Sequence, residues 1–424
     1  ARRSRVPTWW TEIELFISSS KIGNVYISVH NWIGVSSRDE LKQDSQPLVE
    51  KVTTVNFAFT EEQEELRSFI RSFMEEKSAE ATVRELMETD DGYDSAVWSQ
   101  MAEQLGLQSM IIPEEYGGQG FGYVELGIAL EEMGRSLLCA PFFSTVVLAG
   151  NAIIHSGNED AKAALLPGIA DGSTIATMAL AEPSGRWDAE GITVEASGTG
   201  DGATITGEKM FVTDGGTANL FVVAARAEGG IHLYTVDGDA TGLSRENLST
   251  MDQTRKQARI TFDGTPASHL CDTNDFSYIA QILDLAAVAL ANEQVGGAQF
   301  VMDMAVQYAK DRVQFGRPIG SFQAIKHKCA DMLLEVESAK SAAYYAAWCA
   351  SEMNDELPTV ASLAKAYCSE AYFHCAAENI QIHGGIGFTW EHPAHLYFKR
   401  AKSSELMFGD PAYHRELLAQ RIGL

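Results

Sequence analysis

The stretch Arg400-Ala401-Lys402-Ser403-Ser404-Glu405-Leu406-Met407-Phe408-Gly409-Asp410 lies near the end of the 424-residue sequence and is followed by Pro411. Glu405 belongs to the body of a predicted helix, and Gly409 then allows a turn. Asp410 directly before Pro411 has the pattern of a helix N-cap with proline at the first helical position. The sequence therefore predicts a helix, a turn and a second helix over 411–418.

Most of the sequence upstream of this stretch has a helical pattern. Alanine-rich windows at 277–312, 321–352 and 358–381 suit an antiparallel helical bundle. Between about residue 174 and 265 the hydrophobic period changes to two, which predicts a small β-barrel or sandwich. We expect strands at 174–180, 192–195, 203–212, 220–225, 232–236 and 258–262. Before them we expect a helix that begins near Thr60 and further helices at 95–105, 123–133, 144–154 and 160–166.

These changes of period predict a mainly α-helical protein with a β-domain in the middle. The expected parts are an N-terminal helical domain over 55–173, a β-domain over 174–274 and a C-terminal helical bundle domain over 275–424. Residues 1–54 show no sustained period of either kind, and we interpret them as an atypical N-terminal extension.

Composition narrows the possible partners. The net charge is −26 and the pI is about 4.7, and a chain so acidic repels nucleic acid and anionic membrane surfaces. The six cysteines never approach CxxC spacing, which indicates buried thiols in a reducing cytoplasm. The sequence has no run of about 18 apolar residues, the length that a membrane span requires.

Several short motifs, taken together, resemble the acyl-CoA dehydrogenase family over about residues 55–421. The resemblance implies that family's fold and FAD-dependent α,β-dehydrogenation of an acyl-CoA thioester to a trans-2-enoyl-CoA, in fatty acid or lipid metabolism. It also implies a homo- or heterotetramer and an electron-transfer flavoprotein as electron acceptor. The motifs are Ile112 to Gly120, Ala181-Glu182-Pro183, Met210-Phe211-Val212-Thr213-Asp214, Arg312-Val313-Gln314-Phe315-Gly316 and Gln381 to Phe388.

The same resemblance implies a set of FAD contacts. Thr213 is expected to face the N5 and O4 edge of the flavin, where a hydroxyl can donate or accept a hydrogen bond. The residues from the helical half are expected to reach the FAD of a neighbouring subunit, so the active unit is at least a dimer. The implied contacts are Phe211, Thr213, Arg312, Phe315, Gln323, Gln381, Gly384 and Gly385.

The sequence departs from the family where the catalytic base is expected. Phe408 stands in the position of the usual glutamate, and it keeps the backbone N–H that would bind the thioester oxygen. The second location known for the base falls at Ala286, which is also unable to accept a proton. Asp410 is our first candidate for the base, with Glu293 and Glu405 as alternatives. A helix N-cap is the competing interpretation of Asp410.

Two further departures concern the substrate. Trp187 replaces a serine that often contacts CoA, and the family's Asp-Lys-Thr-Arg turn becomes Asp284-Leu285-Ala286-Ala287. We expect either a bulky or branched substrate such as a steroid-derived CoA thioester, or a non-catalytic FAD-binding and scaffold subunit of a heteromeric assembly. No metal site is expected, because no carboxylate or cysteine joins the sequence cluster of His383, His392, His395 and His414 at ligand spacing.

Overall fold

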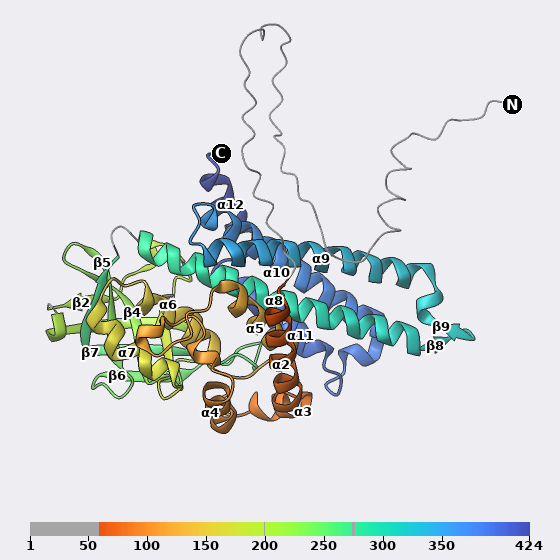
Figure 1. Cartoon of the computed structure of the whole chain (residues 1–424), viewed down its shortest axis with the longest axis horizontal. Helices are drawn as coiled ribbons and strands as arrows, with labels where there is room; N and C mark the ends of the chain where they lie inside the picture. The colour runs from red at the N-terminus through yellow and green to blue at the C-terminus, as the bar shows by residue number, and fades with distance from the viewer. Residues whose placement is uncertain (1–58, 199, 274–275) are drawn as a thin grey trace, which may run out of the picture. The chain divides into compact units, whose positions relative to one another are not determined.

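The computed structural model describes residues 59–198, 200–273 and 276–424, and within it Gln63–Leu424 forms one compact unit. The predicted extension over residues 1–54 lies outside the described residues. The predicted fold class, helical with a middle β-domain, is confirmed (Figure 1).

The first block of the described chain is helical. Asp94 begins one of its helices as an N-cap, because its carboxylate accepts hydrogen bonds from the N–H groups of Ala96 and Val97. The helix predicted over 144–154 differs from expectation, since it opens with an eight-residue π-helix, η3. The elements are α2 (Glu61–Lys77), α3 (Glu80–Leu86), α4 (Ser95–Glu103), η1 (Leu107–Ser109), η2 (Glu114–Tyr116), α5 (Tyr123–Arg135), η3 (Phe143–Gly150), α6 (Asn151–Ile154) and α7 (Glu159–Ala170).

The middle block is a closed β-barrel. Its pairing runs β4-β2-β3-β7-β5 and returns to β4, while β1 joins the ring beside β4 in parallel and β6 joins beside β7. β6 was not predicted, and β7 continues ten residues beyond the predicted strand over 258–262. The strands are β1 (Ala176–Ala179), β2 (Glu195–Ser197), β3 (Ala203–Thr213), β4 (Leu220–Ala227), β5 (Gly230–Asp237), β6 (Leu243–Asn247) and β7 (Gln257–Asp272), with short helices η4 (Ala189–Gly191) and η5 (Gly200–Gly202).

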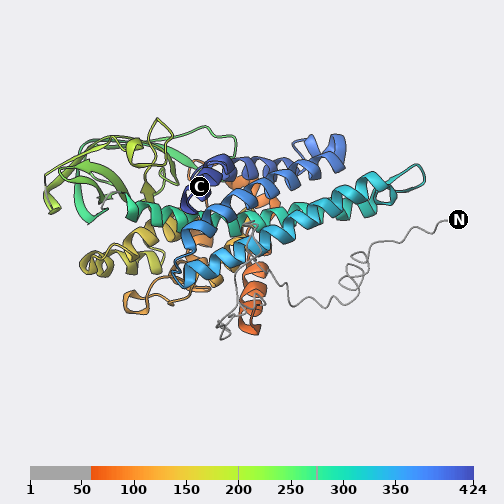
Figure 2. The ribbon, with the colours of Figure 1, turned by 90° about the horizontal axis from the view of Figure 1, so that it is seen from above.

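The last block is a helical bundle whose long helices agree closely with the predicted windows. α8, α9 and α10 run side by side (Figures 1 and 2). The hairpin of β8 and β9 connects the far end of α8 to α9. The elements are α8 (Ser277–Asp311), β8 (Val313–Gln314), β9 (Arg317–Pro318), η6 (Ile319–Ser321), α9 (Gln323–Ser351), α10 (Leu357–His383), η7 (Gly384–Phe388), α11 (Ala394–Leu406) and α12 (Pro411–Arg421).

Glycines allow α5 and α8 to pack backbone against backbone. A Cβ added at Gly296 of α8 would lie 1.8 Å from the carbonyl oxygen of Glu131, and one added at Gly134 of α5 would lie 2.0 Å from the carbonyl oxygen of Glu293. Both distances are far below van der Waals contact, so neither position accepts a side chain without separating the helices. This crossing ties the first helical block to the bundle.

We predict that Gly296→Ala lowers the free energy of unfolding by about 3 kcal/mol, the upper end of the usual cost of overpacking, because the methyl group meets a backbone carbonyl that cannot move aside. Denaturant unfolding followed by circular dichroism measures the change. Gly202→Ala is the matched control, since a Cβ at Gly202 meets nothing within 4 Å. Equal stability of the two variants would contradict the proposed close crossing.

Candidate functional site

A cavity of about 430 Å³ lies where the barrel meets α8 and α11. Met210 to Thr213 at the end of β3 form one wall, and Leu283 of α8 with Leu406 of α11 form part of another. Trp187 and Phe408 also line the cavity, so most of its surface is apolar. Such a cavity suits a flat aromatic group or an acyl chain.

Phe408 closes this cavity as a buried side chain. Its ring stacks on Phe143 of η3, with centroids 5.9 Å apart, and meets Trp187 edge-on at 5.5 Å. Its φ of 61° lies in the left-handed region, which a residue with a Cβ seldom adopts. The N–H of Phe408 has no hydrogen-bond acceptor among the described residues.

The turn that carries Phe408 is held by two buried side chains. The ammonium group of Lys365 on α10 donates to the carbonyl oxygens of Glu405, at 3.0 Å, and Gly409, at 3.1 Å. The carbonyl oxygen of Phe408 accepts a hydrogen bond from Nε2 of His414 at 3.1 Å. Burial lowers the pKa of His414 to about 3, so its imidazole is neutral and carries its proton on Nε2. Side chains therefore bind the carbonyls of residues 405, 408 and 409.

A buried charge network lies beside the cavity and connects the barrel to the bundle. Glu293 of α8 binds Nη2 of Arg255, at 2.6 Å for its Oε2, and Nη1 of Arg400, at 3.1 Å for its Oε1. Arg400 also donates from Nε to Oδ2 of Asp252 at 2.9 Å. Two guanidinium groups and two carboxylates balance in charge, which is the condition for burying ions. Glu293 is thus the link between α8, α11 and the segment that joins β6 to β7.

Each carboxylate considered as a base is already bound to another group. Asp410 is exposed and caps α12, since its Oδ1 accepts the N–H of Tyr413 at 2.8 Å. Glu405 binds Nζ of Lys402 at 2.8 Å, and Glu293 binds the two arginines. The N-cap interpretation of Asp410 is confirmed, while the assignment of a base to any of the three stays a prediction.

Sequence reasoning missed the one carboxylate that lines the cavity among the described residues, Asp252. Both of its oxygens are bound, Oδ2 to Arg400 and Oδ1 to the N–H and hydroxyl of Thr254. It also missed Arg255 and Lys365. Neither Asp252, Arg255 nor Lys365 belongs to a local motif, and only the fold brings them to the site.

The residues expected to contact FAD form two separate groups. Phe211, with a φ of 56°, and Thr213 line the cavity. The others lie at the opposite end of α8, where rings of Tyr308 and His383 stack with centroids 4.1 Å apart and join the ends of α8 and α10. This second group contains Arg312, Phe315 and Gln323 around the β8–β9 hairpin, and Gln381, Gly384 and Gly385 at the end of α10.

The length of α8 separates the two groups. The helix has 35 residues, which corresponds to about 50 Å at 1.5 Å per residue. Leu283 at the cavity lies near its start, and Arg312 directly follows its end. One extended dinucleotide would not span this distance, so the two groups of one chain would not contact the same FAD.

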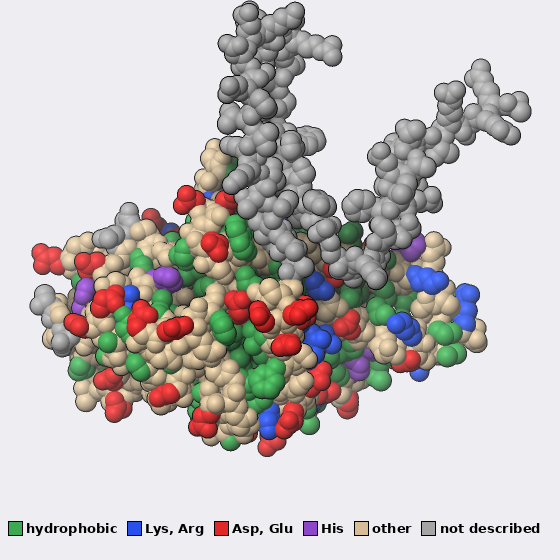
Figure 3. Space-filling model, in the orientation of Figure 1, with side chains coloured by type: hydrophobic (Ala, Val, Ile, Leu, Met, Phe, Trp, Pro, Cys, Tyr) green, Lys and Arg blue, Asp and Glu red, His purple; other side chains and the backbone are tan. Residues whose placement is uncertain are grey.

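The second group has the features of an anion site. Arg312 is exposed, and Lys and Arg side chains gather at the end of the molecule where β8 and β9 lie, in contrast to the acidic surface elsewhere on the face in Figure 3. A Cβ at Gly384 or Gly385 would meet nothing within 4 Å, so the backbone of this segment is open to a ligand. Phe315 is 91% exposed and offers an aromatic surface. These residues fit the diphosphate and adenosine parts of FAD.

Comparison with protein families agrees with this arrangement. Three consecutive segments match models of the acyl-CoA dehydrogenase N-terminal domain (residues 60–173), middle domain (177–265) and C-terminal domain (276–423). The chain belongs to the acyl-CoA dehydrogenase family, whose members are flavoprotein oxidoreductases that act on acyl-CoA.

The chain aligns with individual relatives over nearly the whole length of each relative. "Acyl-CoA dehydrogenase IpdE2" of Mycobacterium tuberculosis is 35% identical over 84% of this chain and 95% of its own. A variant of the "Tcur3481-Tcur3483 steroid ACAD" has a TM-score of 0.78 and 31% identity, covering 85% of this chain and 98% of the other. The "ChsE4-ChsE5 complex from Mycobacterium tuberculosis" has a TM-score of 0.79 and 26% identity, covering 87% and 99%.

The cysteines and the hydrophobicity of the helices can also be compared with the predictions from the sequence. All six cysteines are free, and five of them are buried, as expected for thiols that pack as small apolar groups. Among the helices of the described residues, none is both long and apolar enough to cross a membrane.

We predict that Lys365 makes stability depend on pH above neutrality. Burial lowers the pKa of Lys365 to about 7, although nearby Glu405 opposes this shift. Between pH 7 and the unfolded value near 10.4, the unfolded chain binds a proton that the folded chain has lost, so stability rises with pH. The wild type should gain about 3 kcal/mol over Lys365→Met between pH 7 and pH 9.5.

Urea unfolding of both proteins across this pH range measures the difference, because other titrating groups are common to the two. A constant difference would contradict the shifted pKa of Lys365. Near-ultraviolet circular dichroism of Lys365→Met reports whether the turn around Phe408 loses its fixed packing.

Proposed function

We propose that this chain is an FAD-binding subunit of a heteromeric acyl-CoA dehydrogenase, in which a partner subunit supplies the carboxylate that removes the α-proton. The assembly converts an acyl-CoA thioester to a trans-2-enoyl-CoA. One observation carries the proposal: at Phe408, where the resemblance to the family expects the base, the cavity has an apolar ring, and every carboxylate considered near the cavity is bound to another group.

The chain keeps the parts of the site that do not require a carboxylate. The N–H of Phe408 is free of acceptors among the described residues and can stabilise an oxyanion on the thioester. Lys365 and His414 hold this N–H in position by binding the neighbouring carbonyls. Thr213 lies at the cavity wall, where its hydroxyl can bind the flavin edge. When bound, FAD accepts the β-hydrogen as hydride and passes electrons on, by our proposal to an electron-transfer flavoprotein.

The proposal gives the far end of α8 a role in a neighbouring protomer. Arg312, Gln381 and the open backbone at Gly384 would hold the diphosphate and adenosine of the flavin whose ring lies in the partner's cavity. A two-fold dimer already uses each surface once, and the tetramer we propose is a pair of such dimers. The two-component names of the ChsE4-ChsE5 complex and the Tcur3481-Tcur3483 enzyme support a heteromeric arrangement.

We further propose a bulky acyl group, such as one derived from a steroid. The cavity is mostly apolar, and Trp187 packs against Phe408 rather than offering a polar contact to CoA. The similar Tcur3481-Tcur3483 protein is described as a steroid acyl-CoA dehydrogenase. A branched or polycyclic acyl group would match such a lining through apolar burial.

We predict that Phe408→Glu gives the purified, FAD-reconstituted chain a base that the wild type lacks. Exchange of the substrate α-proton in deuterated water should accelerate by about 10²- to 10⁴-fold, which is the usual contribution of a positioned base. Mass spectrometry of a steroid side-chain CoA thioester measures the exchange, and butyryl-CoA should exchange more slowly.

Phe408→Gln is the matched control, because it has the same shape as the glutamate variant and cannot accept the proton. Bound flavin is measured in all three proteins. A wild-type chain that exchanges as fast as Phe408→Glu would place the base within this chain and overturn the proposal. Asp410→Asn would then test the first candidate.

We predict that Arg312→Ala weakens FAD binding by the assembled oligomer about 10- to 100-fold, the effect of losing a charge-assisted hydrogen bond. Flavin retained after gel filtration, measured by absorbance, reports the change. Arg415→Ala is the control, since Arg415 is an exposed arginine that binds Glu370 on the bundle. Full retention of flavin by Arg312→Ala would refute the assigned contact.

A further inference from the structure

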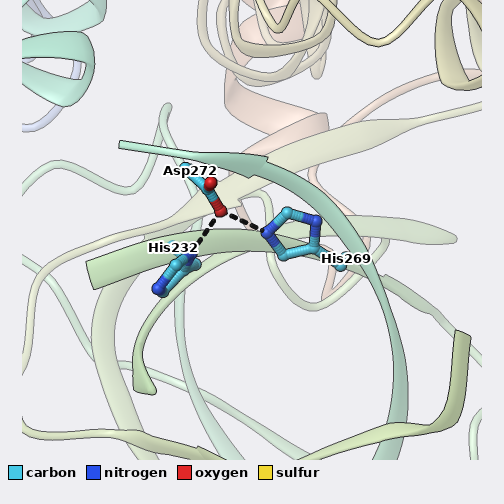
Figure 4. Close-up of side chains that lie close together, drawn as sticks. All are labelled: His232, His269 and Asp272. Atoms are coloured by element: carbon cyan, nitrogen blue, oxygen red, sulfur yellow. Dashed lines mark hydrogen bonds and ion pairs between the residues drawn. The ribbon is translucent and has the colours of Figure 1, made fainter. Parts of the chain in front are cut away.

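A second cluster of functional side chains lies on the barrel, formed by His232 of β5 with His269 and Asp272 of β7 (Figure 4). Nδ1 of His232 lies 2.7 Å from Oδ1 of Asp272, and Nε2 of His269 lies 2.9 Å from the same oxygen. The three atoms all lie within 4.8 Å of one another. None of these residues lines the cavity described above.

A β-bulge brings the three side chains together. His232 pairs with Asp272 and Leu233 with Cys271, but Tyr234 pairs with His269, so Leu270 is an extra residue on β7. In a regular strand, residues three apart such as His269 and Asp272 point to opposite faces. The bulge reverses this alternation and turns both to the outer face, while Leu270 and Cys271 remain buried.

The chemistry of the cluster is that of a transition-metal site. Two imidazole nitrogens and a carboxylate oxygen are common ligands of zinc and similar divalent ions. Each nitrogen that now faces Asp272 donates a proton to it, and the same nitrogen can bind a metal when the neutral ring carries its proton on the other nitrogen. His232 can face the cluster only through Nδ1, because its Nε2 is buried and has no partner among the described residues.

Metal binding would change the spacing of the three ligand atoms. In a tetrahedral site with bonds of about 2.0 Å, neighbouring ligand atoms are about 3.3 Å apart. The two nitrogens, now 2.7 and 2.9 Å from the carboxylate oxygen, would move about 0.5 Å away from it, and since the three atoms lie within 4.8 Å of one another, the nitrogens would also move closer together. The side chains of Asp272 and His269 are 62% and 33% exposed and can move, and solvent can supply a fourth ligand.

We propose that His232, His269 and Asp272 bind a divalent transition-metal ion of the zinc type, which clamps β5 to the last residue of β7. The adjacent residue already makes a similar link, since the hydroxyl of Thr273 donates to the carbonyl oxygen of Ile231 at 2.6 Å. A metal here would fix the point at which the chain leaves the barrel. The net charge of −26 favours binding of a cation. The prediction of no metal site from the sequence considered only the histidines at 383, 392, 395 and 414, which do not belong to this cluster.

The test uses the full chain after dialysis against a chelator. Titration with Zn²⁺ in a calorimeter should give one ion per chain, and Co²⁺ should give the visible absorption of a tetrahedral or five-coordinate site. His232→Gln and His269→Gln should each weaken binding at least tenfold, because loss of even an outer contact costs 10- to 100-fold. Zn²⁺ should raise the melting temperature of the wild type by a few degrees and leave both variants unchanged.

His374→Gln is the matched control, since His374 also bonds a carboxylate, with Nδ1 2.7 Å from Oε2 of Glu335, but belongs to the bundle. It should bind Zn²⁺ as the wild type does. Two results would overturn the proposal and show that the cluster is only a hydrogen-bonded group. One is a wild-type protein that binds no Zn²⁺, and the other is that both variants bind Zn²⁺ as tightly as the wild type does. If the chelator-treated variants have the same circular dichroism spectrum as the wild type, misfolding is excluded as the cause of their weaker Zn²⁺ binding.

Discussion

The ion pairs of Glu293 with Arg255 and Arg400 hold the site together. They join three elements distant in sequence, and all of the charges are buried, so loss of one partner would leave an uncompensated ion at a cost of about 3 to 5 kcal/mol. The backbone of Glu293 is also the surface against which Gly134 packs. The same residue therefore fixes both the helix crossing and the joint between barrel and bundle. The cavity lies at that joint, and its shape depends on it.

This arrangement separates the position of a catalytic residue from its chemistry. The turn at Phe408 has a left-handed φ and is held by Lys365 and His414, which bind backbone carbonyls and do not depend on the side chain at residue 408. An aromatic ring can therefore replace a carboxylate while the N–H keeps its place. In the function we propose, this subunit contributes binding and polarisation, and another subunit contributes proton removal. Such a division fits an assembly in which protomers share each flavin.

The length of α8 gives the physical reason for sharing. One rigid helix connects the cavity to the basic end, and about 44 Å of helix lies between Leu283 and Arg312. No movement of side chains can bring Phe211 and Arg312 of one chain to the same dinucleotide. In the function we propose, a neighbouring subunit therefore supplies the second half of each flavin site, and oligomerisation follows from the geometry of the two groups.

Periodicity in the sequence was sufficient for the long helices and five of the barrel strands, and the Asp-Pro pattern was sufficient for the N-cap at Asp410, because these depend on neighbours a few residues away. It was not sufficient for β6, for the π-helix at Phe143 or for the full length of β7, whose hydrogen bonds depend on distant partners. Local patterns also gave no sign of Asp252, Arg255 and Lys365. The bulge at Leu270 is the clearest case, since one extra residue reversed the face of His269 and placed it beside Asp272. The sequence by itself determines local preferences for helices, strands and caps, because these depend on neighbouring residues. Contacts between distant segments form only when the chain has folded, so only the tertiary structure decides them.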